Sequence, residues 1–371
     1  FAVDGIDYYA GWPSKLTGSI PPVPSEFAVY QVREPIGVVG LISPWNGPTA
    51  VFAMVVAALS CGNSVVLKPA EQTPMAAVGM AELALEAGIP SGVFNVVQGV
   101  GETVGAALVA HPAVDAISFT GSVDTGRAIQ ANAAARVKRV SLELGGKSPF
   151  IVFDDADLEG ATAAAMMGVW GASGQVCTCG TRLLVQRDIH DELVDTIVES
   201  SRGMRLGSGF DPETQMGPLV SADQLARVER YVAIGRDEGA ELALGGSRWG
   251  DAGYFHEPTV FADVDNDATI AREEIFGPVL SVIPFASVDE VVAMSNDNEY
   301  GLAAGVWTND LSRAHRASRA LRAGTVWVNT YQMVYPTVPY GGVKQSGHGR
   351  TLGEASIDEL TQTKSVWMKV G

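Results

Sequence analysis

Between residues 36 and 143, short runs rich in valine, isoleucine and leucine alternate with alanine-rich segments long enough to form helices. This alternation is typical of a parallel β-sheet covered by helices on both faces. The expected strands are Val38 to Ile42, Ser64 to Leu67, Phe94 to Val97, Ala116 to Thr120 and Val137 to Leu142. Because ligands of parallel sheets bind beyond the carboxyl ends of the strands, the residues that follow each run are candidates for a functional site.

The same rhythm restarts beyond Gly146, with strands expected at Pro149 to Phe153 and Arg182 to Val185. Helices are expected between and after them, at Leu158 to Gly168 and Ile189 to Arg202. A chain of 371 residues has room for two domains. We therefore expect an α/β fold whose first domain covers 1–20 and 34–146 and whose second covers 147–345.

Two segments outside this rhythm alternate as strands, Phe27 to Val32 and Thr361 to Val370. We expect them to form an arm over 21–33 and 360–371 that pairs with another subunit rather than leave exposed strand edges. A homodimer or homotetramer follows as an expectation.

Composition argues against several classes of partner. The net charge is 25 − 42 = −17 with no lysine or arginine block, so nucleic acid and anionic membranes are poor partners. The longest apolar runs, such as Val51 to Leu59, are too short to span a bilayer. Three cysteines and five scattered histidines give neither a disulfide framework nor a metal-ligand spacing, which favours a reducing, cytoplasmic compartment and no metal.

The sequence begins at Phe1, inside what reads as a helix. We therefore expect that early elements of the first domain, and any targeting signal, precede this residue.

Two motifs supply a candidate nucleophile and a candidate base. Cys177 follows Gly174-Gln175-Val176, and Glu143 lies among apolar residues and glycines in the run from Ser141 to Gly146. Alternative interpretations remain open for each, because a free cysteine is usually a small buried hydrophobe and Glu143 could face solvent on an alternating strand.

Polar residues follow three of the expected strands. Asn46, in the turn Ser43 to Pro48, offers an amide to a developing oxyanion, or else an Asx turn that caps the next helix. Lys68 and Glu71 could hold the hydroxyls of a ribose, with Glu71 repelling a 2′-phosphate and so favouring NAD over NADP; the alternative is a surface ion pair. Gly121-Ser122 opens a helix whose N–H groups could bind a pyrophosphate, although short glycine turns are common.

Two later segments are also candidates for binding. Glu273 and Glu274 precede Phe276 and could mark a cofactor contact or simply a helix end before a strand. The aromatic segment from Tyr331 to Tyr340 suits a substrate entrance, and core packing explains its aromatics equally well.

Seven motifs taken in order are far more specific than any one of them. The chain resembles the aldehyde dehydrogenase superfamily, in its hydrolytic branch, over essentially its whole length. The resemblance implies a Rossmann-type cofactor domain, an α/β catalytic domain and a small β oligomerisation arm. The motifs are Pro44-Trp45-Asn46, Leu67-Lys68-Pro69-Ala70-Glu71, Phe119-Thr120-Gly121-Ser122, Leu142-Glu143-Leu144-Gly145-Gly146, Gly174-Gln175-Val176-Cys177, Glu274-Ile275-Phe276-Gly277-Pro278 and Pro339-Tyr340-Gly341-Gly342.

The resemblance also implies roles for matching positions. Cys177 is implied as the catalytic thiol, Glu143 as the general base, and Asn46 as half of an oxyanion hole completed by the Cys177 N–H. The implied NAD-binding residues are Ser43, Pro44, Trp45, Lys68, Glu71, Gly121, Ser122, Leu144, Glu274 and Phe276. By position, the residues expected to line the aldehyde tunnel are Val51, Met54, Trp170, Val176, Thr178, Val334 and Tyr340, with Gly47 and Gly171. None of these is charged, which favours a medium-chain or aromatic aldehyde over a small charged semialdehyde.

The implied function is oxidation of an aldehyde to a carboxylic acid with NAD, through a cysteine thioester that a Glu143-activated water hydrolyses. One alternative is a coenzyme A-acylating dehydrogenase, which Glu143 disfavours because those branches lack a carboxylate there. A second is a non-catalytic relative kept for binding or assembly. The intact set of Cys177, Glu143 and Asn46 argues against that alternative.

Overall fold

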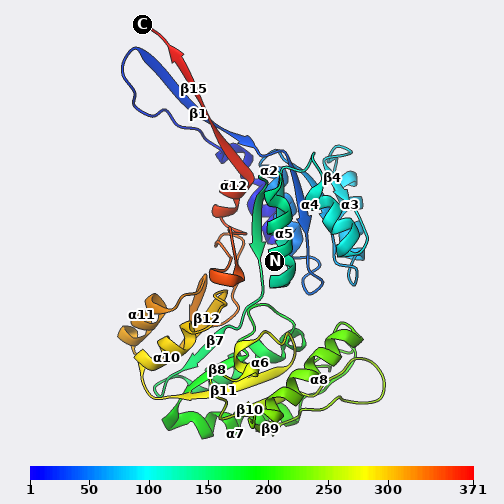
Figure 1. Cartoon of the computed structure of the whole chain (residues 1–371), viewed down its shortest axis with the longest axis vertical. Helices are drawn as coiled ribbons and strands as arrows, with labels where there is room; N and C mark the ends of the chain where they lie inside the picture. Colours follow the sequence, from blue (N-terminus) through cyan, green and yellow to red (C-terminus); the bar gives the residue numbers. More distant parts are fainter. The chain divides into compact units, whose positions relative to one another are not determined.

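The computed structural model describes residues 1–371 and divides into two compact units (Figure 1). Unit 1 comprises Phe1–Glu143, Val334–Gly341 and Gly347–Gly371. Unit 2 comprises Leu144–Met333 and Gly342–Ser346. The chain therefore leaves unit 1 directly after Glu143.

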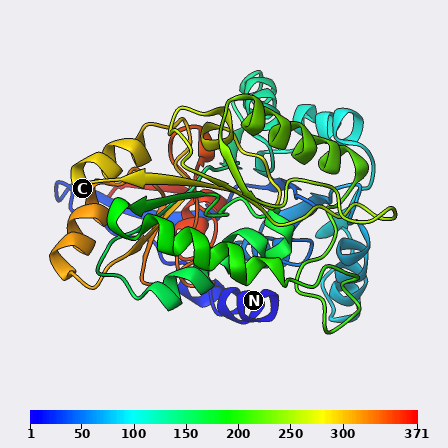
Figure 2. The same cartoon turned by 90° about the horizontal axis from the view of Figure 1, so that it is seen from below.

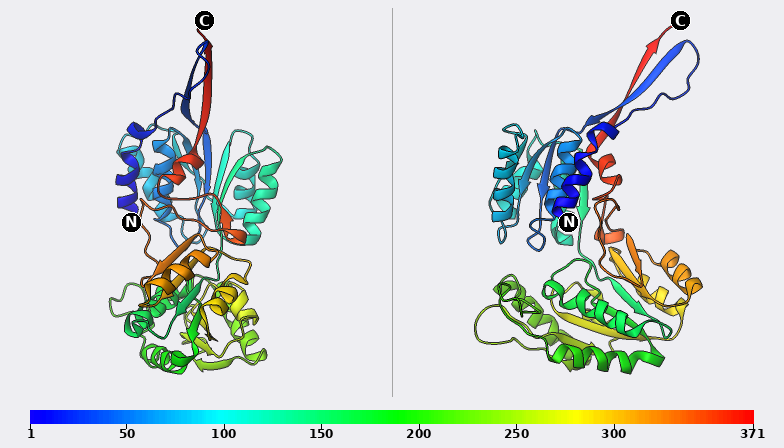
Figure 3. Two further views of the ribbon diagram at one scale, coloured as in Figure 1. Left: turned by 90° about the vertical axis from the view of Figure 1, so that its left-hand side faces the viewer. Right: turned by 180° about the vertical axis from the view of Figure 1, so that it is seen from behind.

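Unit 1 is built on a six-stranded sheet in the order β14-β6-β5-β2-β3-β4. All neighbouring strands are parallel except β14, which runs antiparallel to β6. The strands are β2 (Val38–Ile42), β3 (Ser64–Lys68), β4 (Phe94–Val96), β5 (Ala116–Thr120), β6 (Arg139–Glu143) and β14 (Gly347–His348). Val39 and Leu41 of β2 and Val65 and Leu67 of β3 are buried, because both faces of this sheet carry helices (Figure 3).

The helices of unit 1 include the crossover connections that parallel strands require. They are α1 (Ala2–Ala10), α2 (Val51–Ser60), α3 (Met75–Glu86), α4 (Ala106–Ala110), α5 (Val123–Ala134) and α12 (Ala355–Leu360). A π-helical turn, Gly101–Gly105, leads into α4. Tyr9 of α1 is fully buried, and its hydroxyl lies 2.9 Å from the Ser356 hydroxyl, so the first and last helices are tied together.

The two alternating segments pair with each other. β1 (Phe27–Pro35) and β15 (Thr361–Lys369) form an antiparallel ribbon, in register from Phe27 opposite Lys369 to Pro35 opposite Thr361. The ribbon extends away from the sheet of unit 1 (Figure 1), and Trp367 on it is 60% exposed. Its use as a contact between subunits remains a prediction.

Unit 2 contains a seven-stranded sheet in the order β13-β12-β7-β8-β11-β10-β9. Only β9, at one edge, is antiparallel to its neighbour. The strands are β7 (Pro149–Val152), β8 (Arg182–Gln186), β9 (Glu241–Leu244), β10 (Thr259–Ala262), β11 (Val279–Phe285), β12 (Ala303–Trp307) and β13 (Thr325–Val328). The central strands are mostly apolar, and Ile151, Leu184, Ile283 and Val306 on them are 0–1% exposed.

The helices of unit 2 lie on both sides of these strands (Figure 2). They are α6 (Leu158–Trp170), α7 (His190–Arg202), α8 (Ala222–Asp237), α9 (Thr269–Arg272), α10 (Val288–Asn296) and α11 (Leu311–Ala320). None of the helices in either unit has both the length and the apolar character that a bilayer crossing needs.

One expected strand boundary is wrong in an informative way. The run from Val137 to Leu142 was expected to be a strand, but β6 begins at Arg139 and ends at Glu143. Val137 is 92% exposed with φ at 54°, so it belongs to the turn that leads into the strand. The shift makes Glu143 the last residue of a buried strand, with its side chain buried rather than facing solvent.

Candidate active site

The loop that carries Cys177 follows the end of α6 in unit 2. Three consecutive residues before it, Ala172, Ser173 and Gly174, have positive φ angles of 49°, 58° and 73°. A Cβ on Gly174 would lie 2.1 Å from the carbonyl oxygen of Gly277. Only glycine fits at this position, because both the backbone conformation and the close approach exclude a side chain. A Cβ on Gly277 would in turn lie 2.3 Å from the Val228 side chain, so each glycine is required by its own close contact.

Gln175 holds this loop in place. Its side-chain amide donates to the Ala172 carbonyl at 3.0 Å, and its side-chain oxygen accepts the N–H of Val220 at 2.9 Å. On the other side of Cys177, the Tyr331 hydroxyl donates to the Thr178 carbonyl at 2.8 Å. The sulfur is therefore presented from a loop that is fixed on both flanks.

The three thiols differ in access. Cys61 and Cys179 are buried, whereas Cys177 is partly exposed. Burial raises the pKa of Cys61 to about 11 and that of Cys179 to about 12, so neither forms a thiolate readily near neutral pH. Cys177 is the cysteine whose sulfur a solute can reach.

Glycines also bring Glu274 beside this loop. A Cβ on Gly145 would lie 2.1 Å from a carboxylate oxygen of Glu274, and a Cβ on Gly146 would lie 2.8 Å from the Cys177 carbonyl oxygen. The Gly146 N–H donates to the Glu274 carboxylate at 3.1 Å. Within unit 2 the structure therefore gathers the Leu-Gly-Gly motif, the cysteine loop and Glu274.

The cluster in unit 2 lies at the opposite edge of its sheet from the edge considered for the first domain. Its residues precede β7, β8 and β11. These three strands are adjacent and parallel, so the segments before them meet at the amino-terminal edge of the sheet. The rule for ligands of open parallel sheets does not place this half of the site.

Glu274 has a raised pKa, and Phe276 has an uncommon backbone conformation. Burial raises the pKa of Glu274 to about 7, against the opposing effects of the Gly146 N–H, Arg227 and Lys147. Phe276 has φ at 61°, which is rare for a bulky residue, and its carbonyl accepts from the Gln224 side chain at 2.7 Å. Such local strain is common where a backbone is shaped to receive a ligand.

Sequence reasoning missed the residues that surround Glu274. Lys147 is 2% exposed, its ammonium nitrogen has no hydrogen-bond partner, and burial lowers its pKa to about 7. Arg227 approaches Glu274 from α8 and donates to the Ile275 carbonyl at 3.1 Å. A lysine directly before a buried strand was a usable signal for Lys147. Nothing in the sequence of an amphipathic helix singles out Arg227.

In unit 1, the candidate residues do follow the carboxyl ends of parallel strands. Glu143 ends β6 and Lys68 ends β3, while Asn46 lies in the turn after β2 and Ser122 follows β5. Helix α2 has Ala50 as its N-cap residue. Ser43, Pro44 and Trp45 lie in the same turn, and the Ser43 N–H donates to the Lys68 carbonyl at 3.1 Å.

Glu143 is 5% exposed, and neither of its carboxylate oxygens makes a hydrogen bond of normal geometry. Burial raises its pKa to about 8, although Arg350 and Thr351 lie near enough to favour the charged form. A Cβ on Gly341 would lie 2.7 Å from a Glu143 carboxylate oxygen, which accounts for the first glycine of the Tyr-Gly-Gly motif. A buried carboxyl with a pKa near neutrality is suited to take up and release a proton.

Lys68 and Glu71 border a hollow of about 590 Å³. The Lys68 ammonium donates to the Pro69 carbonyl at 2.9 Å and to the Glu71 carboxylate at 3.1 Å. Lys68 is 2% exposed, whereas the Glu71 side chain is 37% exposed. The hollow is lined by Pro69, Ala70, Glu71, Pro74, Gln98 and Gly99.

Ser122 is the N-cap of α5, where its hydroxyl accepts the Thr125 N–H at 3.3 Å. A Cβ on Gly121 would lie 2.4 Å from the Phe119 ring, so this turn requires glycine. The free N–H groups of a twelve-residue helix begin here, in the same unit as the hollow beside Lys68. Leu144 opens unit 2, where its N–H donates to the Ser346 carbonyl at 3.0 Å.

The residues expected to line an aldehyde tunnel are divided between the units. Val51, Met54, Val334 and Tyr340 belong to unit 1, and Trp170, Val176 and Thr178 belong to unit 2. Trp170 is 2% exposed and its indole N–H donates to the Ser201 hydroxyl at 3.0 Å, which fixes it where α6 packs on α7. A shared tunnel remains a prediction.

Comparison with known proteins gives a consistent result. The aldehyde dehydrogenase family matches residues 1–366. The chain is 48% identical to cytosolic aldehyde dehydrogenase 1 of Rattus norvegicus, covering 100% of this chain and 74% of the rat protein. It is also 48% identical to betaine aldehyde dehydrogenase of Brucella melitensis, covering 100% and 77%. The structure of an aldehyde dehydrogenase from Bacillus cereus in complex with NAD⁺ matches with a TM-score of 0.98 and 46% identity, covering 100% of this chain and 76% of that one.

The difference in burial among the cysteines predicts their order of reaction. With a chromogenic disulfide reagent at neutral pH, Cys177 should react at least about tenfold faster than Cys61 and Cys179, because buried thiols ionise poorly. Stopped-flow absorbance would measure the phases. The variant Cys177→Ser should lose the fast phase, and Cys179→Ser should keep it. A fast phase that survives in Cys177→Ser would contradict this assignment.

Proposed function

The chain belongs to the aldehyde dehydrogenase family, and we propose that it oxidises an aldehyde to a carboxylic acid with NAD⁺ as the hydride acceptor. The observation that carries the proposal is the position of Cys177. This cysteine is partly exposed, it lies on a loop that is hydrogen-bonded on both sides, and its carbonyl packs against Gly146. Glu274, which accepts the Gly146 N–H, lies in the same cluster. This arrangement supplies a positioned nucleophile with a cofactor contact beside it.

The first step is carried by Cys177 and Asn46. The Cys177 thiolate adds to the carbonyl carbon of the aldehyde, which forms a carbon–sulfur bond and places a negative charge on the oxygen. The Asn46 side-chain amide and the Cys177 N–H donate hydrogen bonds to that oxygen. Convergence of the two residues on one oxygen is part of the proposal.

The residues that would hold NAD⁺ form two groups. Lys68 and Glu71, beside their hollow, suit the adenosine ribose, and the N-terminus of α5 at Ser122 suits the pyrophosphate. Glu274 and Phe276 would hold the nicotinamide ribose. When bound, NAD⁺ supplies the acceptor for the hydride that leaves the substrate carbon.

Glu143 completes the reaction. Its carboxylate takes a proton from a water molecule, which then attacks the thioester carbon and displaces the Cys177 sulfur as the acid forms. The buried carboxyl that this step needs is present, and this favours hydrolysis over acyl transfer to coenzyme A. The apolar residues expected around the aldehyde favour a medium-chain or aromatic substrate. Assembly into a dimer or tetramer, and a cytoplasmic location, are proposed on the sequence alone.

A panel of aldehydes tests the activity. We expect NADH formation, followed at 340 nm, with medium-chain or aromatic aldehydes to give a higher kcat/KM than with succinic semialdehyde, because no charged residue is expected to meet the substrate. The variant Cys177→Ser is the control and should form no NADH. Absence of NADH formation from every aldehyde would favour the non-catalytic alternative, and dependence on coenzyme A would favour the acylating one.

The substitution Glu143→Gln separates acylation from hydrolysis. We expect a burst of NADH close to one per active site, then steady-state turnover lower by about 10²-fold or more, because the amide cannot accept a proton. The pKa of about 8 adds a pH dependence. Since the base acts only when charged, hydrolysis in the unmodified protein should rise as pH increases through about 8, and the variant should lack that rise. Steady-state turnover unchanged in Glu143→Gln would refute this role.

Glu71 should determine the choice between cofactors. Replacing it with Gln removes a negative charge that would face a 2′-phosphate, so the ratio of kcat/KM for NAD over NADP should fall by about tenfold, or roughly 1.4 kcal/mol. Initial rates with both cofactors measure this ratio. Glu86→Gln, at the exposed end of α3, is the matched control and should leave it unchanged. If the NAD-to-NADP ratio of kcat/KM in Glu71→Gln equals that in Glu86→Gln, Glu71 does not discriminate between the two cofactors.

A further inference from the structure

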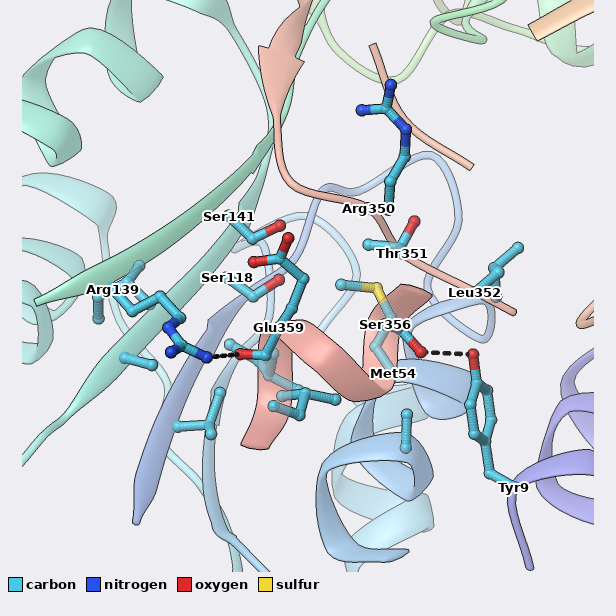
Figure 4. Close-up of a pocket in the computed structure, with 16 residues that line it drawn as sticks. Tyr9, Met54, Ser118, Arg139, Ser141, Arg350, Thr351, Leu352, Ser356 and Glu359 are labelled. Atoms are coloured by element: carbon cyan, nitrogen blue, oxygen red, sulfur yellow. Dashed lines mark hydrogen bonds between the residues drawn. The ribbon is translucent and has the colours of Figure 1, made fainter. Parts of the chain in front are cut away.

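A cavity of about 480 Å³ lies in unit 1 beneath α12 and the segment from Arg350 to Leu352 (Figure 4). Its floor is formed by strands β2, β5 and β6. Most of its wall is apolar, with Val39, Leu41 and Ile117 among the lining residues. Polar lining residues, among them Ser118, Arg139 and Ser141, lie on or beside β6.

The polar side chains share one side of the cavity because of strand geometry. Arg139, Ser141 and Glu143 alternate along β6, so their side chains point to the same face, with neighbours roughly 6.6 Å apart. In the parallel pairing of β5 with β6, Ser118 stands opposite Ser141. A row of polar groups therefore leads along the strand from Glu143 into the cavity.

Ser141 lies between Arg139 and Glu143 in this row. It is 8% exposed, and its hydroxyl has no hydrogen-bond partner in the protein. A Cβ on Gly349 would lie 2.4 Å from that hydroxyl, so the chain covers it closely. An unpaired buried hydroxyl is destabilising. A water molecule on the polar side of the cavity would satisfy the Ser141 hydroxyl.

Glu359 closes the other end of the row. Its side chain rises from α12 toward Ser118 and Ser141 (Figure 4), and it is only partly buried. Arg139 does not pair with that carboxylate; its guanidinium donates to the backbone carbonyls of Asp358, Glu359 and Thr361 at 3.1, 3.2 and 2.8 Å. The carboxylate is thus left as an acceptor between the buried hydroxyls and solvent.

Glu143 needs a route for proton release if it is the base of the proposed reaction, since every turnover leaves a proton on a carboxyl that is 5% exposed. The charged or titratable groups that face it or line the cavity are Arg350, Arg139, Tyr9 and Glu359. Tyr9 is bonded to Ser356, and burial raises its pKa to about 12, so it does not exchange protons near neutrality. Among these groups, Glu359 is the only carboxylate, and its side chain extends toward Ser141 (Figure 4).

We propose that Ser141 and Glu359, joined by water in this cavity, carry the proton from Glu143 to solvent; the inference rests on the proposed function. Protonated Glu143 gives its proton to a water that bridges it to Ser141, and that water passes a proton to the Ser141 oxygen. Ser141 releases its own hydroxyl proton toward the Glu359 carboxylate, which then loses a proton to bulk water. No electrons are transferred, and each group returns to its starting state. Ser141 and Glu359 touch neither substrate nor cofactor and act through Glu143.

The experiment measures hydrolysis directly, so that it does not depend on which step limits turnover. Enzyme is mixed with NAD⁺ and substoichiometric aldehyde, quenched at intervals, and the acylated form is followed by intact-protein mass spectrometry. Glu359→Gln and Ser141→Ala should each slow decay of the acyl-enzyme by on the order of tenfold, with the rate and amplitude of NADH formation unchanged. Ser141→Thr, which keeps a hydroxyl, should restore the rate.

Two further readouts distinguish a relay from a structural role. Formate, a small carboxylate, should accelerate decay in Glu359→Gln in proportion to its concentration, and the solvent deuterium isotope effect on decay should increase in that variant. Glu354→Gln, which replaces an exposed carboxylate at the N-cap of the same helix, is the matched control and should match the unmodified protein.

The outcomes that oppose the relay are distinct from those that oppose the function. Acyl-enzyme decay unchanged in Glu359→Gln and Ser141→Ala, with a normal burst of NADH, overturns the relay and leaves the proposed function standing. Slow decay in Ser141→Ala that Ser141→Thr does not restore, or slow decay in Glu359→Gln that formate does not rescue, also overturns it, because it indicates lost packing. Absence of acyl-enzyme in the unmodified protein overturns the proposed function itself.

Discussion

The packing of backbone against backbone around Cys177 is the constraint on which the unit 2 site depends. Gly174 meets the Gly277 carbonyl, and Gly146 meets the carbonyl of Cys177 itself, at distances that leave no room for a Cβ. Protein interiors are packed so densely that one added carbon must displace a neighbour. The glycines of three motifs are therefore parts of one contact surface, and that surface determines where the sulfur can be.

The two buried carboxyl groups, Glu143 and Glu274, have different hydrogen-bonding surroundings. Burial raises the pKa of both Glu143 and Glu274. Glu274 is held by the Gly146 N–H, with Arg227 and Lys147 nearby, which suits a group that fixes a ligand. Glu143 makes no hydrogen bond of normal geometry and borders a row of hydroxyls, which suits a group that must exchange protons. The same residue type serves two purposes because its neighbours differ.

Much of the architecture was predictable from the sequence. The run from Val38 to Ile42 coincides with β2 and that from Ala116 to Thr120 with β5, because buried parallel strands must be continuously apolar. Val137 was misassigned because its apolar side chain fits a strand pattern while its backbone forms a turn. Both alternating segments are strands, as expected, and they pair with each other; pairing with another subunit stays a prediction.

The sequence by itself determined which residues are candidates for chemistry: a cysteine among small neighbours, a carboxylate two residues before a pair of glycines, and a lysine and a glutamate at a strand end. These signals are local, because reactive groups need particular neighbours along the chain. Only the tertiary structure decided that Cys179 is buried, that Arg227 and Lys147 lie near Glu274, and that the Glu359 side chain extends toward Ser141. Burial and long-range contacts arise from helices and strands that are distant in sequence, so no local pattern records them.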